Sequence, residues 1–144
     1  MSVSSLPFLQ EALAAVLPKL AAWRRDFHAH PEAGWTEFRT AALIIRRLHG
    51  LGYAIRMGEA ACAPGRRMGV PSPAVLEAAR ERALGHGADA GLVAGMGDGY
   101  TGFWADLDCG PGPVTAFRFD MDCNEVVECA EGSHRPAREG FASR

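Results

Sequence analysis

Two aspartates separated by a single residue are the first candidates for chemistry in this 144-residue chain. Asp120 and Asp122 end a run whose composition is typical of a β-strand, and alternation along a strand places both carboxylates on one face, about 6.6 Å apart. Neighbouring carboxylates raise each other's pKa unless a cation or hydrogen-bond donors neutralise them. The pair therefore indicates either a metal site or, as the spacing alone favours, a solvated strand end.

Three glutamates extend this acidic stretch. Glu125, Glu128 and Glu131 bring the acids between residues 120 and 131 to five, with no basic residue among them. A stretch of this kind either forms a rim that attracts cations or is the solvated face of a loop, and the pattern leaves both interpretations open.

Two histidines, His28 and His30, have the appearance of a metal-binding pair, but their predicted place at the end of a helix argues against a shared ion. Residues two apart on a helix point to different sides. Histidine interacts favourably with the negative end of the helix dipole, and Pro31 is expected to end the helix. We therefore expect these residues to have a structural role.

Other motifs point away from nucleotide binding and nucleophilic catalysis. Gly97, Gly99 and Gly102 match the pattern GxGxxG, and Asp120 follows at about the distance of a ribose-binding acid. A dinucleotide fingerprint follows a strand and opens a helix, whereas these glycines open a strand, so they predict a flexible turn. The sequence also has no GxSxG motif, and neither Cys62 nor Cys123 lies in a recognisable nucleophile motif.

Three helices are expected to position these residues. Apolar residues recur every three or four positions from residue 9 to residue 27, which predicts an amphipathic helix that Pro18 should kink or restart. A second helix should start with Thr36 as its N-cap and stop at Gly50, with one apolar face formed by Phe38, Ala41, Ala42, Ile45 and Leu48. A third should start with Ser72 as its cap and Pro73 in its first turn, and should end near residues 85–87.

The pattern between the helices and after them predicts strands. Residues 53–57 read as a short strand, and residues 103–107 and 114–120 read as two strands joined by a turn, which should pair antiparallel. The polar segment 123–144 reads as a loop. We therefore predict the α/β class, with helices packed on a mixed sheet that includes a β-hairpin near residues 101–120.

Composition excludes two broad classes of protein. The 15 Lys and Arg against 17 Asp and Glu give a net charge of −2, too small to attract nucleic acid or an anionic membrane, and no apolar run is long enough to span a bilayer. No basic residue precedes the apolar run at residues 13–20, so it does not read as a signal peptide. The four cysteines have neither CxxC spacing nor the density of a disulfide scaffold, which predicts free thiols and a cytoplasmic protein.

Taken together, several stretches resemble the dinuclear-metal amidohydrolases and carboxypeptidases, the family of hippurate hydrolases and aminoacylases. The resemblance runs from about residue 17 to residue 143, nearly the whole chain, and is carried by residues 23–32 (WRRDFHAHPE), 36–53 (from TEFRTA to LGY) and 117–122 (FRFDMD). Further stretches narrow the resemblance to the aminobenzoyl-glutamate hydrolase branch: residues 67–71 (RMGVP), 133–136 (SHRP) and 140–143 (GFAS).

The resemblance implies a hydrolase that cleaves an N-acyl or aryl amide bond to glutamate or a similar amino acid. It implies two divalent metal ions, Zn or Mn, a glutamate base, and a second, smaller domain for dimerisation and closure over a small-molecule substrate. It places Asp122 in the catalytic centre as the acid that supports the metals. Asp120 stands where carboxypeptidase relatives have a histidine ligand, which makes it the weaker candidate for metal ligation. His30, Pro31 and Glu32 match a signature whose role is mainly structural.

The resemblance also predicts that residues 1–144 are only the N-terminal part of a catalytic domain. In the family, a His-Ala-Cys-Gly-His-Asp segment with metal ligands follows the point where this chain ends, and the glutamate base and further ligands come later. We therefore expect this chain to be inactive alone, to bind metal weakly, and to work as part of a homo- or hetero-oligomer. The alternative is a non-catalytic truncated module that binds a partner protein chain.

Overall fold

The computed structural model describes residues 7–143, in two compact units. One unit comprises the chain up to Pro31 together with the segment from Val126 onward, and the other comprises Glu32–Glu125. Residues 1–6 and 144, which the expected domain 1–144 includes, lie outside the described part. None of the helices in residues 7–143 is long and apolar enough to cross a bilayer.

The first unit is built on one long helix, α1 (Pro7–Ala29). The helix continues through Pro18, so the expected restart there is wrong. Proline removes one intrahelical hydrogen bond, but residues before and after it are good helix formers that carry the helix past that position. Its apolar stripe is exposed over most of its length, with Ala29 the buried residue of the helix.

The second unit is organised around α2 (Phe38–His49). Phe38, Ala41, Ala42 and Ile45 are all buried, which confirms the predicted apolar face. The expected N-cap is wrong, because the helix begins after Glu37, and the Thr36 hydroxyl donates instead to the carbonyl of Ala33 at 2.7 Å.

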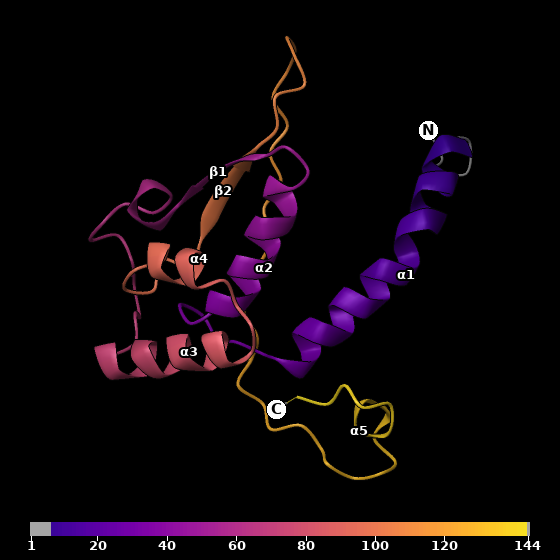
Figure 1. Ribbon diagram of the computed structural model, residues 1–144, viewed down its shortest axis with the longest axis vertical. Coiled ribbons are helices and arrows are strands. Elements are labelled where there is room, and N and C mark those ends of the chain that lie inside the picture. Colours follow the sequence, from indigo (N-terminus) through magenta and orange to yellow (C-terminus); the bar gives the residue numbers. More distant parts are fainter. Residues whose placement is uncertain (1–6, 144) are drawn as a thin grey trace. The chain divides into compact units, whose positions relative to one another are not determined.

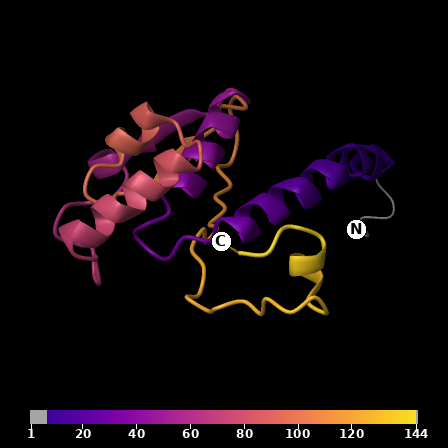
Figure 2. The same cartoon turned by 60° about the horizontal axis from the view of Figure 1, so that its bottom comes forward.

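Two further helices cover α2 (Figure 1), and a second view shows the same grouping (Figure 2). α3 (Pro73–Gly85) starts with proline in its first turn, as predicted, and buries Leu76, Ala79 and Ala83. α4 (Ala90–Gly95) was not expected; Asp89 caps it by accepting from the backbone N–H of Leu92 at 2.9 Å. Glycine at both its second and last positions weakens the helical pattern and hides this element in the sequence.

The strand pairing in the sheet differs from the pairing expected from the sequence. β1 (Ala54–Met57) pairs antiparallel with β2 (Phe103–Asp106), with Met57 opposite Phe103. Residues 114–120 form no strand, so the predicted hairpin near residues 101–120 is wrong. Their large side chains are exposed, Val114 at 96% and Phe117 at 78%, and a strand pairing without a buried face has little to stabilise it.

The remaining connections are short helical turns and loops. A 3-10 turn (Gly58–Ala60) follows β1, and the glycine-rich stretch 97–102 forms the predicted turn before β2, with positive φ at Gly97 and Gly99. The polar C-terminal segment contains one short helix, α5 (Arg135–Arg138), where only a loop was expected.

Candidate active site

Asp122 lies beside the loop that leads into α2. The backbone N–H of its neighbour Cys123 donates to the carbonyl of Glu32 at 2.9 Å, which fixes the Asp122 segment against that loop. A Cβ atom added to Gly34 would come within 3.9 Å of Asp122 Oδ2. Asp122 itself is exposed. The structure therefore presents this carboxylate to solvent at the N-terminal end of α2.

Glu32 is the buried carboxylate that holds this end of α2 in place. Its Oε1 accepts from the backbone N–H of Arg39 at 3.0 Å, and its Oε2 accepts from that of Thr40 at 2.7 Å. The first N–H groups of a helix have no partner within the helix, and a carboxylate there also interacts favourably with the helix dipole. Glu32 thus does the capping work predicted for Thr36, from six residues before the helix. This agrees with a structural role for the signature His30-Pro31-Glu32.

Glu37, immediately before α2, is a second buried carboxyl group. Its Oε2 accepts from the hydroxyl of Thr101 at 2.6 Å. Burial raises the pKa of Glu37, and the nearby charges of Asp122 and Glu32 act in the same direction. A functional role for Glu37 was not expected from the sequence, since a glutamate at a helix start is ordinarily a solvent-exposed partner of the helix dipole.

A strained turn separates the two glutamates. The backbone N–H of Thr36 donates to the carbonyl of Ala33 at 2.9 Å, and Trp35, the third residue of this turn, has a φ of 68°. That position favours glycine, and other residues adopt it at a cost of about 1–2 kcal/mol. The indole N–H of Trp35 donates to the carbonyl of Met68 at 2.9 Å, and the Arg67 guanidinium lies 5.6 Å from the ring centre. These contacts help to hold the strained backbone.

Asp120 has different surroundings from Asp122. Its side chain is 63% exposed and pairs with Arg118, with Nη1 and Oδ2 2.9 Å apart. Within residues 7–143, no group of three or more His, Cys, Asp or Glu side chains is placed to hold a metal ion. These residues alone therefore do not supply a ligand set for the two divalent metals that the family resemblance implies.

A separate cluster forms around Glu128 in the first unit. The Nε2 atoms of His28 and His134 lie 2.8 Å and 2.6 Å from Glu128 Oε1, and the backbone N–H of Ser143 donates to Oε2 at 2.6 Å. The Ser143 amide, followed by the two imidazoles, holds the pKa of Glu128 well below its usual range. Glu128 is therefore neither a free solvated acid nor part of an acidic rim, since its oxygens are already taken by donors.

The two histidines of the expected pair have different partners. His28 contacts Glu128, whereas His30 Nδ1 lies 2.9 Å from the Asp26 carbonyl oxygen and 3.4 Å from its carboxylate. Both belong to the end of α1 and the residue that follows it. This arrangement agrees with the structural role expected from their spacing.

Comparison with known proteins shows that this chain is similar to hydrolases named for p-aminobenzoyl-glutamate and for indole-3-acetyl-aspartic acid. The chain is 47% identical over 136 residues to a p-aminobenzoyl-glutamate hydrolase of Escherichia coli (strain K12), an alignment that covers 94% of this chain and 31% of that protein. It is 44% identical over 139 residues to indole-3-acetyl-aspartic acid hydrolase of Enterobacter agglomerans, covering 96% of this chain and 32% of that protein. No protein-family model matches the chain.

A solved structure agrees with these relatives. The aminobenzoyl-glutamate utilization protein from Klebsiella pneumoniae superimposes with a TM-score of 0.79 and 43% sequence identity, over 81% of this chain and 30% of that one. The resemblance to the aminobenzoyl-glutamate hydrolase branch and the α/β class are both confirmed. The chain spans about a third of the length of the curated relatives it matches.

Proposed function

We propose that this chain forms part of the catalytic domain of a metal-dependent amidohydrolase that cleaves an N-acyl or aryl amide bond to glutamate or a similar amino acid. The observation that supports this best is the 47% identity, over 94% of the chain, to the p-aminobenzoyl-glutamate hydrolase. The exposed carboxylate of Asp122, held beside two buried glutamates, is the group in this chain best suited to contribute to such a site.

The proposal assigns the two divalent metals and the general base to sequence corresponding to the rest of the relatives' length. Zinc sites use about four ligands, mostly nitrogen and sulfur, and the described residues do not assemble such a set. Asp120, engaged with Arg118, is the weaker candidate for a ligand. We place the complete enzyme in the cytoplasm, as a homo- or hetero-oligomer.

The residues of this chain have a positioning role in this proposal. Glu32 fixes the first turn of α2 with its carboxylate, while its carbonyl accepts from the Cys123 backbone. The backbone next to Asp122 is thereby held by buried Glu32, and the Asp122 carboxylate is available to orient a partner group. A carboxylate that accepts from the second nitrogen of a metal-bound histidine fixes its tautomer and raises its basicity.

The test compares two neighbouring substitutions in the protein expressed from the complete reading frame. Asp122→Asn keeps the shape of the side chain and removes its charge, so turnover of p-aminobenzoyl-glutamate should fall about 10- to 100-fold. Cys123→Ala should leave turnover within a few-fold, because the Cys123 contact to Glu32 is made by the backbone. The proposal would be refuted if both variants had near-wild-type turnover and if p-aminobenzoate were still released in the presence of a metal chelator.

The amino-acid half of the substrate can be determined in the same assay. The two curated relatives, named for a glutamate conjugate and an aspartate conjugate, are 47% and 44% identical to this chain. We propose glutamate, following the higher identity and the solved relative. A higher kcat/KM for indole-3-acetyl-aspartate than for p-aminobenzoyl-glutamate would contradict this choice.

The isolated chain of 144 residues should show no amidase activity, because loss of one member of a cooperative catalytic site already costs orders of magnitude. Calorimetry with Zn or Mn should detect no binding tighter than micromolar. The second candidate function, a non-catalytic module that binds a partner protein chain, would be favoured by a native stop codon directly after codon 144.

A further inference from the structure

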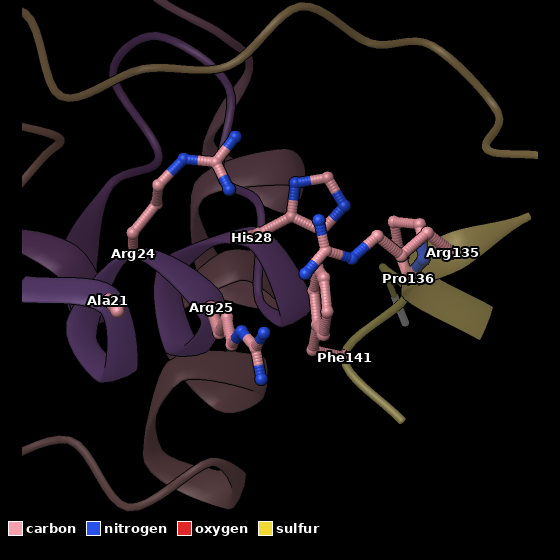
Figure 3. Close-up of a pocket in the computed structure, with 7 residues that line it drawn as sticks. All are labelled: Ala21, Arg24, Arg25, His28, Arg135, Pro136 and Phe141. Carbon is pink, nitrogen blue, oxygen red and sulfur yellow. The ribbon is translucent and has the colours of Figure 1, made fainter. Parts of the chain in front are cut away.

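A pocket in the first unit lies between the last turns of α1 and the C-terminal segment, and none of the residues assigned to catalysis lines it (Figure 3). Its volume is about 370 Å³. Its lining includes side chains from α1 (Arg24, Arg25, His28) and from the C-terminal segment (Arg135, Pro136, Phe141). All of them belong to one compact unit.

The pocket has an excess of positive charge. Arg25 and Arg135 share the carboxylate of Glu139, with Nη2 and Oε2 2.8 Å apart in the first pair and Nε and Oε1 2.6 Å apart in the second. Arg24 has no carboxylate partner among residues 7–143. Three guanidinium groups against two carboxylates, Glu139 and the Glu128 that contacts His28, leave one positive charge at the pocket before any charge on His28 is counted.

Glu139 shows what this group of arginines binds. Its two oxygens are taken by two different guanidinium groups, which lower the pKa of the carboxyl, the Arg135 hydrogen bond being the main cause. Each guanidinium has five N–H donors in a planar fork. Arg25 and Arg135 use one donor nitrogen each for Glu139, so donors remain for a second carboxylate.

The other side of the pocket is lined by an aromatic ring and a proline. The Arg25 guanidinium carbon lies 4.8 Å from the centre of the Phe141 ring, and the His28 ring meets the same ring edge-on at 5.6 Å between centres. Pro136 adds a further apolar surface. Aromatic rings stack on rings and on guanidinium planes, so this side suits a planar aromatic group.

We propose that this pocket binds the carboxylate of a small aromatic acid, with Arg24 as the main partner of the carboxylate and Phe141 against the ring. The inference does not depend on the proposed catalytic function, since it uses neither Asp122 nor any metal. Bidentate pairing with a carboxylate is the interaction for which a guanidinium group is best shaped.

The test is a titration of the 144-residue chain with benzoate, followed by two-dimensional NMR. Benzoate should shift the backbone amides of α1 and of the segment around Phe141, with millimolar affinity. Benzamide, which has the same ring and no charge, should bind at least tenfold more weakly. Inorganic phosphate, an anion without a ring, should also bind more weakly than benzoate.

Two variants of equal charge provide the control. Arg24→Gln should weaken benzoate binding about tenfold, the expected loss for one charge-assisted contact. Lys19→Gln removes one positive charge from an exposed position on the same helix outside the pocket and should change binding less than twofold. Circular dichroism of both variants should match the wild type, because both side chains are exposed.

Three outcomes would overturn the proposal. The first is the absence of benzoate-induced shifts up to about 10 mM. The second is equal weakening by Arg24→Gln and Lys19→Gln, which would indicate general attraction to a basic helix. The third is phosphate binding at least as tight as benzoate binding, which would indicate a general anion site.

Discussion

Removal of the charge on Glu32 is the sharpest test of how the site is positioned. The Glu32→Gln substitution keeps the size of the side chain but replaces one carboxylate oxygen with an NH₂ group. In the wild type the two oxygens accept from the backbone N–H groups of Arg39 and Thr40, and the side chain is 4% exposed. The amide can accept from only one of these donors, so the other is left buried without a partner.

The expected loss of stability follows from these two contacts. A hydrogen bond to a charged group contributes about 1.5–3 kcal/mol, and a buried donor without a partner costs about 1–3 kcal/mol. Loss of the favourable interaction with the helix dipole adds about 0.3–1 kcal/mol. These effects overlap, so we expect Glu32→Gln to destabilise the unit Glu32–Glu125 by about 2–3 kcal/mol, a large value for a substitution that preserves volume.

Amide hydrogen exchange measured by NMR gives the local readout. The backbone amides of Arg39 and Thr40 should exchange about 30- to 160-fold faster in the variant, which corresponds to the same 2–3 kcal/mol. Urea unfolding, monitored by circular dichroism, should show a lower midpoint. Glu81→Gln is the matched control, because Glu81 is exposed on α3 and its replacement should change stability by less than about 0.5 kcal/mol.

Unchanged protection of the Arg39 and Thr40 amides in Glu32→Gln would refute the capping role. Equal destabilisation by Glu32→Gln and Glu81→Gln would refute it as well, because loss of a surface charge would then account for the effect. A drop in stability without faster exchange at these two amides would assign the role of Glu32 to its contacts elsewhere.

Two further substitutions test other parts of the second unit. Burial raises the pKa of Glu37, so the unfolded chain loses this proton at a lower pH than the folded chain does. The stability that the protonated group contributes therefore falls as the pH rises from the ordinary glutamate pKa to the raised pKa. The Glu37→Gln variant, whose side-chain carbonyl can still accept from Thr101, should not show that fall and should be more stable than the wild type at pH 7. A difference in urea midpoint between variant and wild type that is the same at pH 4 and pH 7 would contradict this. The Gly58→Ala substitution places a Cβ 2.8 Å from the carbonyl oxygen of Gly95, at a residue whose φ is 64°. Gly65 has a similar φ, but a Cβ added there meets open space. We therefore expect Gly58→Ala to lower the thermal midpoint several degrees more than Gly65→Ala does. Equal midpoints for the two alanine variants would show that the contact relaxes at little cost.

The helices with strong apolar periodicity could be predicted from the sequence, while their ends depended on tertiary contacts. The buried face of α2 follows directly from the spacing of Phe38, Ala41 and Ile45. Its start does not, because the cap is Glu32, and no local rule connects a carboxylate to backbone groups seven and eight residues further on. Thr36 has the right chemistry for a cap, but its hydroxyl is used in the preceding turn.

The prediction of the strand pairing was wrong for a related reason. Residues 103–107 and 114–120 have similar composition and are separated by a short turn, so local rules favour a hairpin. β2 instead pairs with β1, about fifty residues earlier, because Ile55, Met57 and Phe103 together pack against the buried core. That shared core is a long-range property that neither strand reveals alone.

The candidate site was only partly visible in the sequence. Asp122 stood out because of its spacing and family resemblance, whereas Glu37 and Glu128 lay in segments that read as ordinary polar surface. Glu37 is buried and accepts a hydrogen bond from Thr101. Glu128 has hydrogen-bond partners that are distant in the sequence: His134, Ser143 and His28 are separated from it by 6, 15 and 100 positions. Only the fold brings those donors together.

The small size of the sheet leaves both of its long sides available for growth. In the described residues each strand hydrogen-bonds to one neighbour, so alternate backbone groups along β1 and β2 point outward as a template for another strand. The template also carries a pattern: Ile55 and Phe103 face the helices, while Arg56 pairs with Asp106 on the outer face. An added strand would have to continue this alternation, with apolar side chains toward α2 and polar ones outward, so the two existing strands already specify which face of any strand that extends them is apolar.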